Sequence, residues 1–221
     1  MGKSYIITIA HDKGGSGKSI TAMNLATELS KTNDEFTIVD LDLKQQHLSK
    51  FNANRKKKHN LWINQVNVKT INELKEELMK IKGIVLIDTA GLDSELSRVA
   101  KFLSDLVITP LNNGDTEMDV LKDFKNQMSS MIEKRDDLKC MVLVNRLHHA
   151  DTKTHKAFKK YLKGTKNFSI FDTVLRMRKE YPNTMTRGTS VSEKSKGTAG
   201  IEFLKFVDEV NKKIKKGMSN G

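Results

Sequence analysis

Short runs of apolar and β-branched residues recur along the chain, separated by polar segments. Runs of this length and composition predict strands that are buried on both faces of a sheet. They cover residues 5–10, 36–39, 84–87, 106–109 and 141–144. We therefore expect five core strands that are flanked on both sides by other elements.

Between these runs, apolar residues are spaced three and four apart, which predicts amphipathic helices. The helical segments are residues 20–29, 71–81, 118–132 and 157–162, and Thr70 and Glu73 form a capping box before the second of them. Repeated alternation of strand and helix predicts an α/β fold with a mainly parallel twisted sheet, helices on both faces and right-handed crossovers.

No linker or repeat divides the chain, so residues 1–221 are predicted to form a single domain. The least regular stretches are residues 44–66 and 176–198. Thirteen glycines, two prolines and 37% apolar residues exclude collagen-like and disordered classes.

The charge is unevenly distributed. Lys and Arg number 39 against 27 Asp and Glu, giving a net charge of +12. Residues 151–221 hold 17 basic and 7 acidic side chains, which is +10 of that surplus. This asymmetry predicts a C-terminal surface that faces a polyanion.

Two features of the sequence predict a cytoplasmic location: its cysteine content and its lack of a long apolar segment. The one cysteine, Cys140, lies in an apolar run, which predicts a buried thiol in a reducing compartment. No apolar stretch reaches the roughly 18 residues of a membrane span, and residues 1–5 do not have the organisation of a signal peptide.

A glycine-rich loop follows the first predicted strand and precedes the first predicted helix. Its backbone N–H groups and the helix N-terminus can surround a polyphosphate, Lys18 can contact the β- and γ-phosphates, and the Ser19 hydroxyl can bind Mg²⁺. The expected phosphate-binding residues are Gly14, Gly15, Ser16, Gly17, Lys18, Ser19 and Ile20.

The loop departs from the common G-x-x-x-x-G-K-[ST] pattern, because Asp12 replaces the first glycine and Lys13 precedes Gly14. A second lysine can extend outward to phosphate charge on a partner subunit; alternatively it is an ordinary solvated lysine. Residues 13–19 resemble the deviant Walker A box of the ParA/MinD ATPases. The resemblance implies ATP as the ligand, an ATP-sandwich homodimer and catalytic roles for Lys13 and Lys18.

Acidic residues end two of the predicted strands. Asp40 and Asp42 follow one strand and Asp88 follows another, so these carboxylates can hold the waters of Mg²⁺ together with Ser19. The alternative is that they merely end strands. The resemblance makes Asp42 the catalytic residue that positions the attacking water, and Asp88 the Walker B aspartate. Lys44 stands where the family usually has proline.

Asn145 directly follows the strand predicted at 141–144. The resemblance implies that its amide reads adenine, since an amide can donate and accept hydrogen bonds at once. Outside that context it would be an ordinary turn residue.

The segment 174–193 resembles short ParA proteins that lack an N-terminal helix-turn-helix domain. The resemblance implies DNA partition: the ATP-bound dimer binds DNA without sequence preference, on the nucleoid, until a ParB-like partner stimulates hydrolysis. Phosphate contacts of this kind come from Lys and Arg side chains. The expected DNA-binding residues are Arg178, Arg187, Lys194 and Lys196.

Two other functions remain open. Apolar residues of 201–214 alternate with lysines, as in a basic amphipathic helix on an acidic membrane, the mode of MinD-like division-site ATPases. Asp208 and Glu209 interrupt that charge, and such a stripe more often packs against a sheet, so membrane binding is disfavoured. ATP-coupled reduction or metal-cluster delivery usually needs paired cysteines, and the chain has one.

Overall fold

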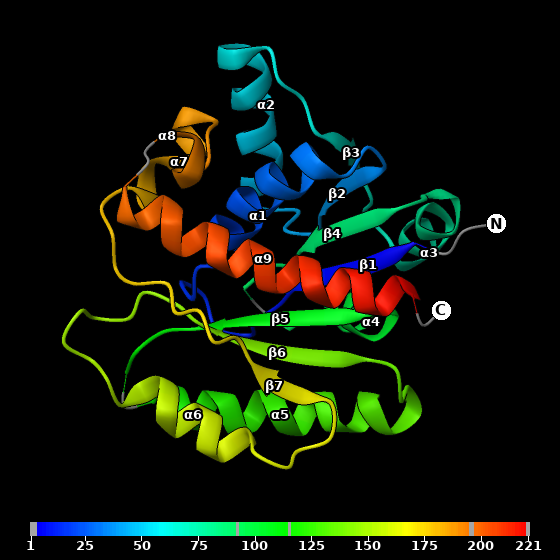
Figure 1. The fold of residues 1–221 in the computed structure, drawn as a ribbon. Helices are drawn as coiled ribbons and strands as arrows, with labels where there is room; N and C mark the ends of the chain where they lie inside the picture. The colour runs from blue at the N-terminus through cyan, green and yellow to red at the C-terminus, as the bar shows by residue number, and fades with distance from the viewer. Residues whose placement is uncertain (1–3, 92, 115, 195–196, 220–221) are drawn as a thin grey trace.

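The computed structural model describes residues 4–91, 93–114, 116–194 and 197–219. The strands of this part of the chain form one parallel sheet in the order β3-β2-β4-β1-β5-β6-β7 (Figure 1). Their bounds are β1 Tyr5–Ile9, β2 Phe36–Asp40, β3 Asn64–Val66, β4 Ile84–Asp88, β5 Leu106–Leu111, β6 Lys139–Val144 and β7 Phe168–Ile170. The predicted fold class is confirmed.

Helices cover both faces of the sheet because alternate residues of each central strand point to opposite sides. In β5, Leu106 and Ile108 belong to one core cluster and Val107 and Leu111 to another. The first face packs against α1 (Lys18–Thr32) and α9 (Thr198–Ser219), and Figure 1 shows α9 crossing it. The second face packs against α3 (Ile71–Lys80), α4 (Glu95–Leu103), α5 (Glu117–Lys134) and α6 (Thr154–Leu162).

The last helix, α9, uses its apolar stripe for the core. Phe203, Phe206 and Val210 are fully buried, whereas Ile201 and Leu204 are exposed. The expectation that this stripe packs against the sheet is confirmed for Phe203, Phe206, Val207, Val210 and Ile214, and it is wrong for Ile201 and Leu204. Among the helices of the described residues, none has the length and apolar character needed to cross a membrane.

The expectation that residues 44–66 are irregular is wrong over most of that stretch. Helix α2 spans His47–His59 and β3 follows it. Its sequence is strongly polar, with Leu48 and Phe51 as its buried apolar residues. Two apolar residues are too few to show a helical period in the sequence, and the helix is stabilised by tertiary packing.

The second irregular stretch, residues 176–198, also contains short helical turns. These are η1 (Tyr181–Asn183), α7 (Thr184–Arg187) and α8 (Val191–Lys194). Figure 1 places α7 and α8 beside α2, so two segments that are far apart in sequence form one corner of the molecule.

Candidate nucleotide-binding site

The glycine loop turns sharply between β1 and α1. Gly15 (φ 78°) and Gly17 (φ 93°) lie in the left-handed region that favours glycine. Gly17 is also the N-cap of α1, so the free N–H groups of the first helical turn face the loop. A side chain at Gly17 would overlap the Asn145 amide nitrogen. The loop therefore depends on glycine at this position.

Lys18 lies under this loop and is 6% exposed. Its Nζ atom donates a hydrogen bond to the Lys13 carbonyl oxygen over 3.3 Å. Burial lowers the pKa of Lys18, while the nearby carboxylates of Asp88, Asp12 and Asp42 act in the opposite direction. The ammonium group is thus partly desolvated, a state that strengthens its attraction to phosphate oxygens.

The loop borders a cavity of about 260 Å³ at the carboxyl ends of the strands, where ligands bind in this class of fold. It is lined by Gly14, Gly15, Gly17, Lys18, Ser19, Ile20, Asp42, Gln45, His47, Thr89, Gly91 and Arg146. A larger cavity, about 470 Å³, lies at the opposite ends of the strands, away from the loop.

Asp40 and Asp42 are both buried, but they occupy different surroundings. Asp40 accepts hydrogen bonds from the backbone N–H of Asp42 and from both the N–H and the hydroxyl of Ser49. It thereby fixes the first turn of α2. Asp42 accepts from the N–H of Gln45 and also lines the cavity. The structure therefore brings Asp42, rather than Asp40, to the cavity surface.

Asp88 ends β4 and is fully buried. Neither carboxylate oxygen has a hydrogen-bond partner within the described residues. Burial raises the pKa of Asp88 to about 8, and the charge of Asp40 adds to that shift, while the Ser19 hydroxyl and Lys18 oppose it. A buried carboxylate without a partner, close to a hydroxyl, fits a cation with a water shell such as Mg²⁺.

The described residues contain no group of three or more His, Cys, Asp or Glu side chains arranged to hold a metal ion. Mg²⁺ at phosphate loops normally takes few protein ligands and keeps several waters and phosphate oxygens. Ser19 and Asp88 have the chemistry that such a site needs, and the metal roles of Ser19, Asp40, Asp42 and Asp88 all stay predictions.

Lys13 is not among the residues that line the cavity. Its Nζ atom lies 2.9 Å from Oε1 of Glu117, the first residue of α5. Its backbone N–H donates to Nδ1 of His11, which is buried. Burial, together with the charge of Lys18, lowers the pKa of His11 to about 4. Sequence reasoning missed both Glu117 and His11, because neither belongs to a motif.

Asn145 contacts the phosphate loop directly. Its Nδ2 atom donates to the Ser16 carbonyl over 2.9 Å, and its Oδ1 atom accepts from the N–H of Arg146. The Arg146 guanidinium donates to the Gly15 carbonyl over 3.1 Å. Both side chains therefore support the loop backbone. The adenine-reading role of Asn145 stays a prediction, and sequence reasoning missed Arg146.

The predicted DNA-binding residues are not equally accessible. Arg178 is half-buried and paired with Glu202 at 2.5 Å. Arg187 is partly exposed on α7, Lys194 is exposed on α8, and Lys196 lies outside the described residues. Arg187 and Lys194 therefore have the freer charges.

Comparison with known proteins gives a family match. A model of the family described as ATPase MipZ matches residues 5–66 and 62–155, which include the whole candidate site. The chain is also similar to Protein ParA of Rhizobium radiobacter, at 27% identity over 106 residues. That match covers 48% of either protein, so the chain spans about half the length of this curated relative.

Solved structures share the fold. A plasmid partition protein of Borrelia burgdorferi bound to AMPPNP has a TM-score of 0.68 at 19% identity, covering 96% of this chain and 100% of that one. MinD of Aquifex aeolicus has a TM-score of 0.69 at 16% identity, covering 94% of this chain and 96% of that one. Apo McdA of Cyanothece has a TM-score of 0.70 at 16% identity, covering 94% and 99%. The fold is that of the ParA/MinD P-loop ATPases.

Proposed function

Because the chain belongs to the ATPase MipZ family, we propose that it is a Mg²⁺-dependent DNA-partition ATPase. It binds ATP at the phosphate loop, forms a sandwich homodimer, and in that state binds DNA without sequence preference. Hydrolysis, stimulated by a ParB-like partner, releases it. The observation that carries the Mg²⁺-nucleotide part of this proposal is the buried carboxyl group of Asp88, which has no hydrogen-bond partner within the described residues and lies beside Lys18 and Ser19 of the loop.

Each residue of the site has a defined task in this proposal. The loop N–H groups and Lys18 bind the phosphates, and Ser19 and Asp88 hold Mg²⁺, which neutralises phosphate charge when bound. Asp42, at the cavity surface, orients the attacking water. Lys13 stabilises phosphate charge on the partner subunit, a contribution that charged residues supplied in trans make in other nucleotide hydrolases.

The DNA part of the proposal is supported by charge and by the named relatives. The net charge is +12, and the residues left exposed at the α7–α8 corner include Lys194. The relatives include a protein named ParA and a plasmid partition protein. Lysine and arginine contacts to phosphates give affinity without sequence preference, and that affinity falls steeply with salt.

A second candidate is division-site positioning on a membrane; the solved structures with this fold include a MinD cell division protein. Exposed Ile201 and Leu204 stand beside lysines on α9, which favours this candidate. However, Phe203, Phe206 and Val210 of the same helix are buried in the core, so α9 could offer a membrane only a narrow apolar strip.

Cosedimentation separates the two candidates. We expect the protein to pellet with DNA in the presence of ATP and Mg²⁺, to stay in solution with ADP, and to stay in solution with vesicles of anionic phospholipid. Lys18→Ala should abolish nucleotide binding and with it DNA retention. ATP-dependent pelleting with vesicles but not with DNA would contradict DNA partition, and normal ATP affinity of Lys18→Ala would contradict the site.

A further inference from the structure

A long part of the N-terminal half has no acidic side chain. Residues 43–72 carry seven basic residues and no Asp or Glu. The basic residues are Lys44, Lys50, Arg55, Lys56, Lys57, Lys58 and Lys69. The adjacent lysines at 56–58 lie in the last turn of α2, and their side chains are exposed. Positive charge therefore gathers at the C-terminal end of this helix, outside the C-terminal region of the chain where sequence reasoning placed it.

The end of α2 is joined to α7. Lys58 Nζ donates to the Thr186 carbonyl oxygen over 2.6 Å, and Nε2 of His59 lies 2.9 Å from the Arg187 carbonyl oxygen. Gly188 makes the close packing possible, since a Cβ atom there would lie 2.6 Å from the Arg55 backbone nitrogen. The lysines of α2 and Arg187 thus share one surface, although about 130 positions separate them in sequence.

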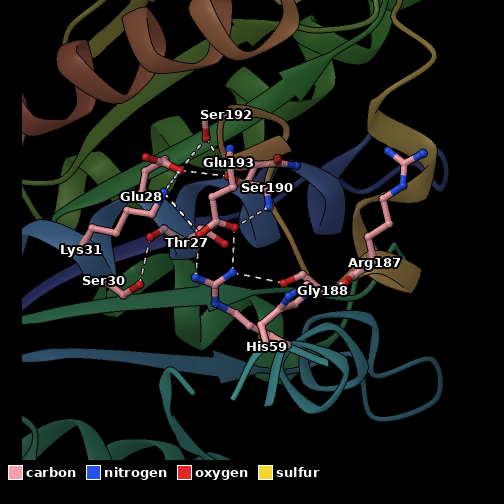
Figure 2. Close-up of polar contacts among 12 residues, drawn as sticks. Thr27, Glu28, Ser30, Lys31, His59, Arg187, Gly188, Ser190, Ser192 and Glu193 are labelled. Carbon is pink, nitrogen blue, oxygen red and sulfur yellow. Dashed lines mark hydrogen bonds and ion pairs between the residues drawn. The ribbon is translucent and has the colours of Figure 1, made fainter. Parts of the chain in front are cut away.

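A buried polar network holds this corner and keeps its acidic groups inside. Arg55 donates to both carboxylate oxygens of Glu193, over 2.7 and 2.8 Å. Glu28 of α1 pairs with Lys31 over 2.7 Å and also accepts hydrogen bonds from Ser190 and Ser192. Figure 2 shows the glutamates directed toward these partners. Their charges are therefore compensated internally and do not offset the exposed lysines.

The outward groups are positioned for a partner. In Figure 2 the Arg187 side chain points away from the network. The ammonium group of Lys58 uses one of its three donors on Thr186, which leaves two for another acceptor. Lys56 lies over the Trp62 ring at 5.4 Å, and that ring is 53% exposed. This surface therefore presents several cationic side chains from helices whose backbones are held in place.

We propose that this surface, the α2–α7 patch formed by Lys56, Lys57, Lys58, His59 and Arg187, is the main contact surface for duplex DNA. The inference rests on the proposed function and specifies where DNA binds. Closely spaced cations on rigid elements match the regular phosphates of a duplex, and they carry no base readout. Of the earlier candidates, Arg187 is part of this patch, whereas Arg178 is paired with Glu202.

The patch also has a structural connection to the nucleotide. Helix α2 has 13 residues, so it is about 20 Å long. His47 at its first turn lines the nucleotide cavity, and Asp40 binds Ser49 in the same turn. The patch occupies the other end. Helix α2 therefore links the nucleotide cavity to the patch within a single element.

The test is DNA affinity, measured by fluorescence anisotropy of a labelled duplex of arbitrary sequence with the full chain, AMPPNP and Mg²⁺. The variant is Lys56→Glu/Lys57→Glu, which leaves the contacts of Lys58 and His59 intact. Lys156→Glu/Lys160→Glu is the matched control, because both lysines are exposed on α6 and the charge change is identical. AMPPNP affinity and thermal unfolding check that both variants fold.

We expect the patch variant to bind DNA at least about tenfold more weakly than the control. Its plot of log affinity against log salt should be less steep by about 2, since each phosphate contact contributes about 0.9. Equal DNA affinity of the two variants would contradict the assignment of the α2–α7 patch as the DNA contact surface, while leaving the proposed function intact. Absence of DNA binding by the wild type in every nucleotide state would overturn both.

Vesicles of anionic phospholipid form a second arm of the experiment. The exposed Trp62 beside Lys56 makes a membrane the main rival partner for this surface. We expect little wild-type binding to vesicles and no effect of the patch variant on it. Loss of vesicle binding in the patch variant, with DNA binding equal to that of the control, would overturn the proposal.

Discussion

The Nζ atom of Lys13 lies 2.9 Å from Oε1 of Glu117 within the same chain. The second oxygen of Glu117 accepts from the N–H of Asn112 over 3.1 Å, so the carboxylate is fixed at the start of α5. The Lys13 side chain is 49% exposed, whereas that of Glu117 is 4% exposed. The lysine that is proposed to serve the partner subunit is therefore restrained by its own subunit.

We predict that Glu117→Gln strengthens ATP-dependent dimerisation. The amide can still accept the hydrogen bond from Asn112, but it no longer holds Lys13 by charge. A half-exposed ion pair contributes about 0.2–1 kcal/mol. Both subunits release one such pair when the dimer forms, so the dimer dissociation constant should fall by at most about thirtyfold. Sedimentation velocity at several protein concentrations with AMPPNP measures the change.

Lys13→Ala is the control for this prediction. It removes both the intramolecular ion pair and the proposed contact to the partner, so it should weaken the dimer while AMPPNP still binds. If the wild type sediments as a monomer both with and without AMPPNP, the sandwich dimer itself is contradicted. Equal dimerisation of wild type and Glu117→Gln would show that the ion pair does not restrain Lys13.

We predict that Gly17→Ala abolishes ATP binding while Gly14→Ala is tolerated. Gly17 has a φ of 93°, and an added Cβ would overlap the Asn145 amide that supports Ser16. A left-handed alanine costs about 1–2 kcal/mol before any overlap is counted. A Cβ at Gly14 would meet nothing within 4 Å. Isothermal titration with ATP and Mg²⁺ compares the two, and equal affinities would contradict this account of the loop.

The central fold was predictable because its signals are local. The runs at 84–87 and 106–109 are apolar and rich in β-branched residues, so they predicted β4 and β5. The edge strands β3 and β7 have three residues each, too few for a periodic signal. Helix α2 was missed because it is stabilised by contacts with α7, which lies about 130 positions away.

The candidate site was only partly predictable for the same reason. The phosphate loop and Asp88 belong to short motifs, and the structure brings Asp88 close to Lys18 and Ser19 of the loop. Glu117 and Arg146 contact the loop through tertiary structure alone, so no spacing in the sequence marks them. Arg178 is of a residue type that often contacts DNA phosphates, but its ion pair with Glu202 is visible only in the structure.

We predict that acid destabilises the protein through His11. The folded pKa is about 4 and the unfolded value is 6.5, so the folded state binds fewer protons between these pH values. The free energy of unfolding should therefore decrease as pH falls from about 6.5 to 4, by at most about 1.4 kcal/mol per pH unit. His11→Asn removes this titration. Urea unfolding of both proteins at pH 7.5 and 5 measures it, and parallel losses would contradict the role of His11.

Asp88 should produce the opposite pH dependence in protein without Mg²⁺ or nucleotide. Its folded pKa is about 8 against 3.8 unfolded, so the folded state retains a proton that the unfolded chain loses. Stability due to Asp88 should therefore decrease as pH rises from about 4 to 8, by up to about 1.4 kcal/mol per pH unit, and remain constant above that.

Asp88→Asn tests this dependence. We expect the variant to exceed the wild type in free energy of unfolding at pH 9 by more than at pH 6, because the amide carries no charge that burial penalises. The same variant should lose the stabilisation that Mg²⁺ adds to ATP binding, because a neutral amide attracts the hydrated cation weakly. Thermal unfolding with ATP, in Mg²⁺ or in EDTA, measures that loss. A variant that is equally stabilised by Mg²⁺ would exclude Asp88 from the metal site.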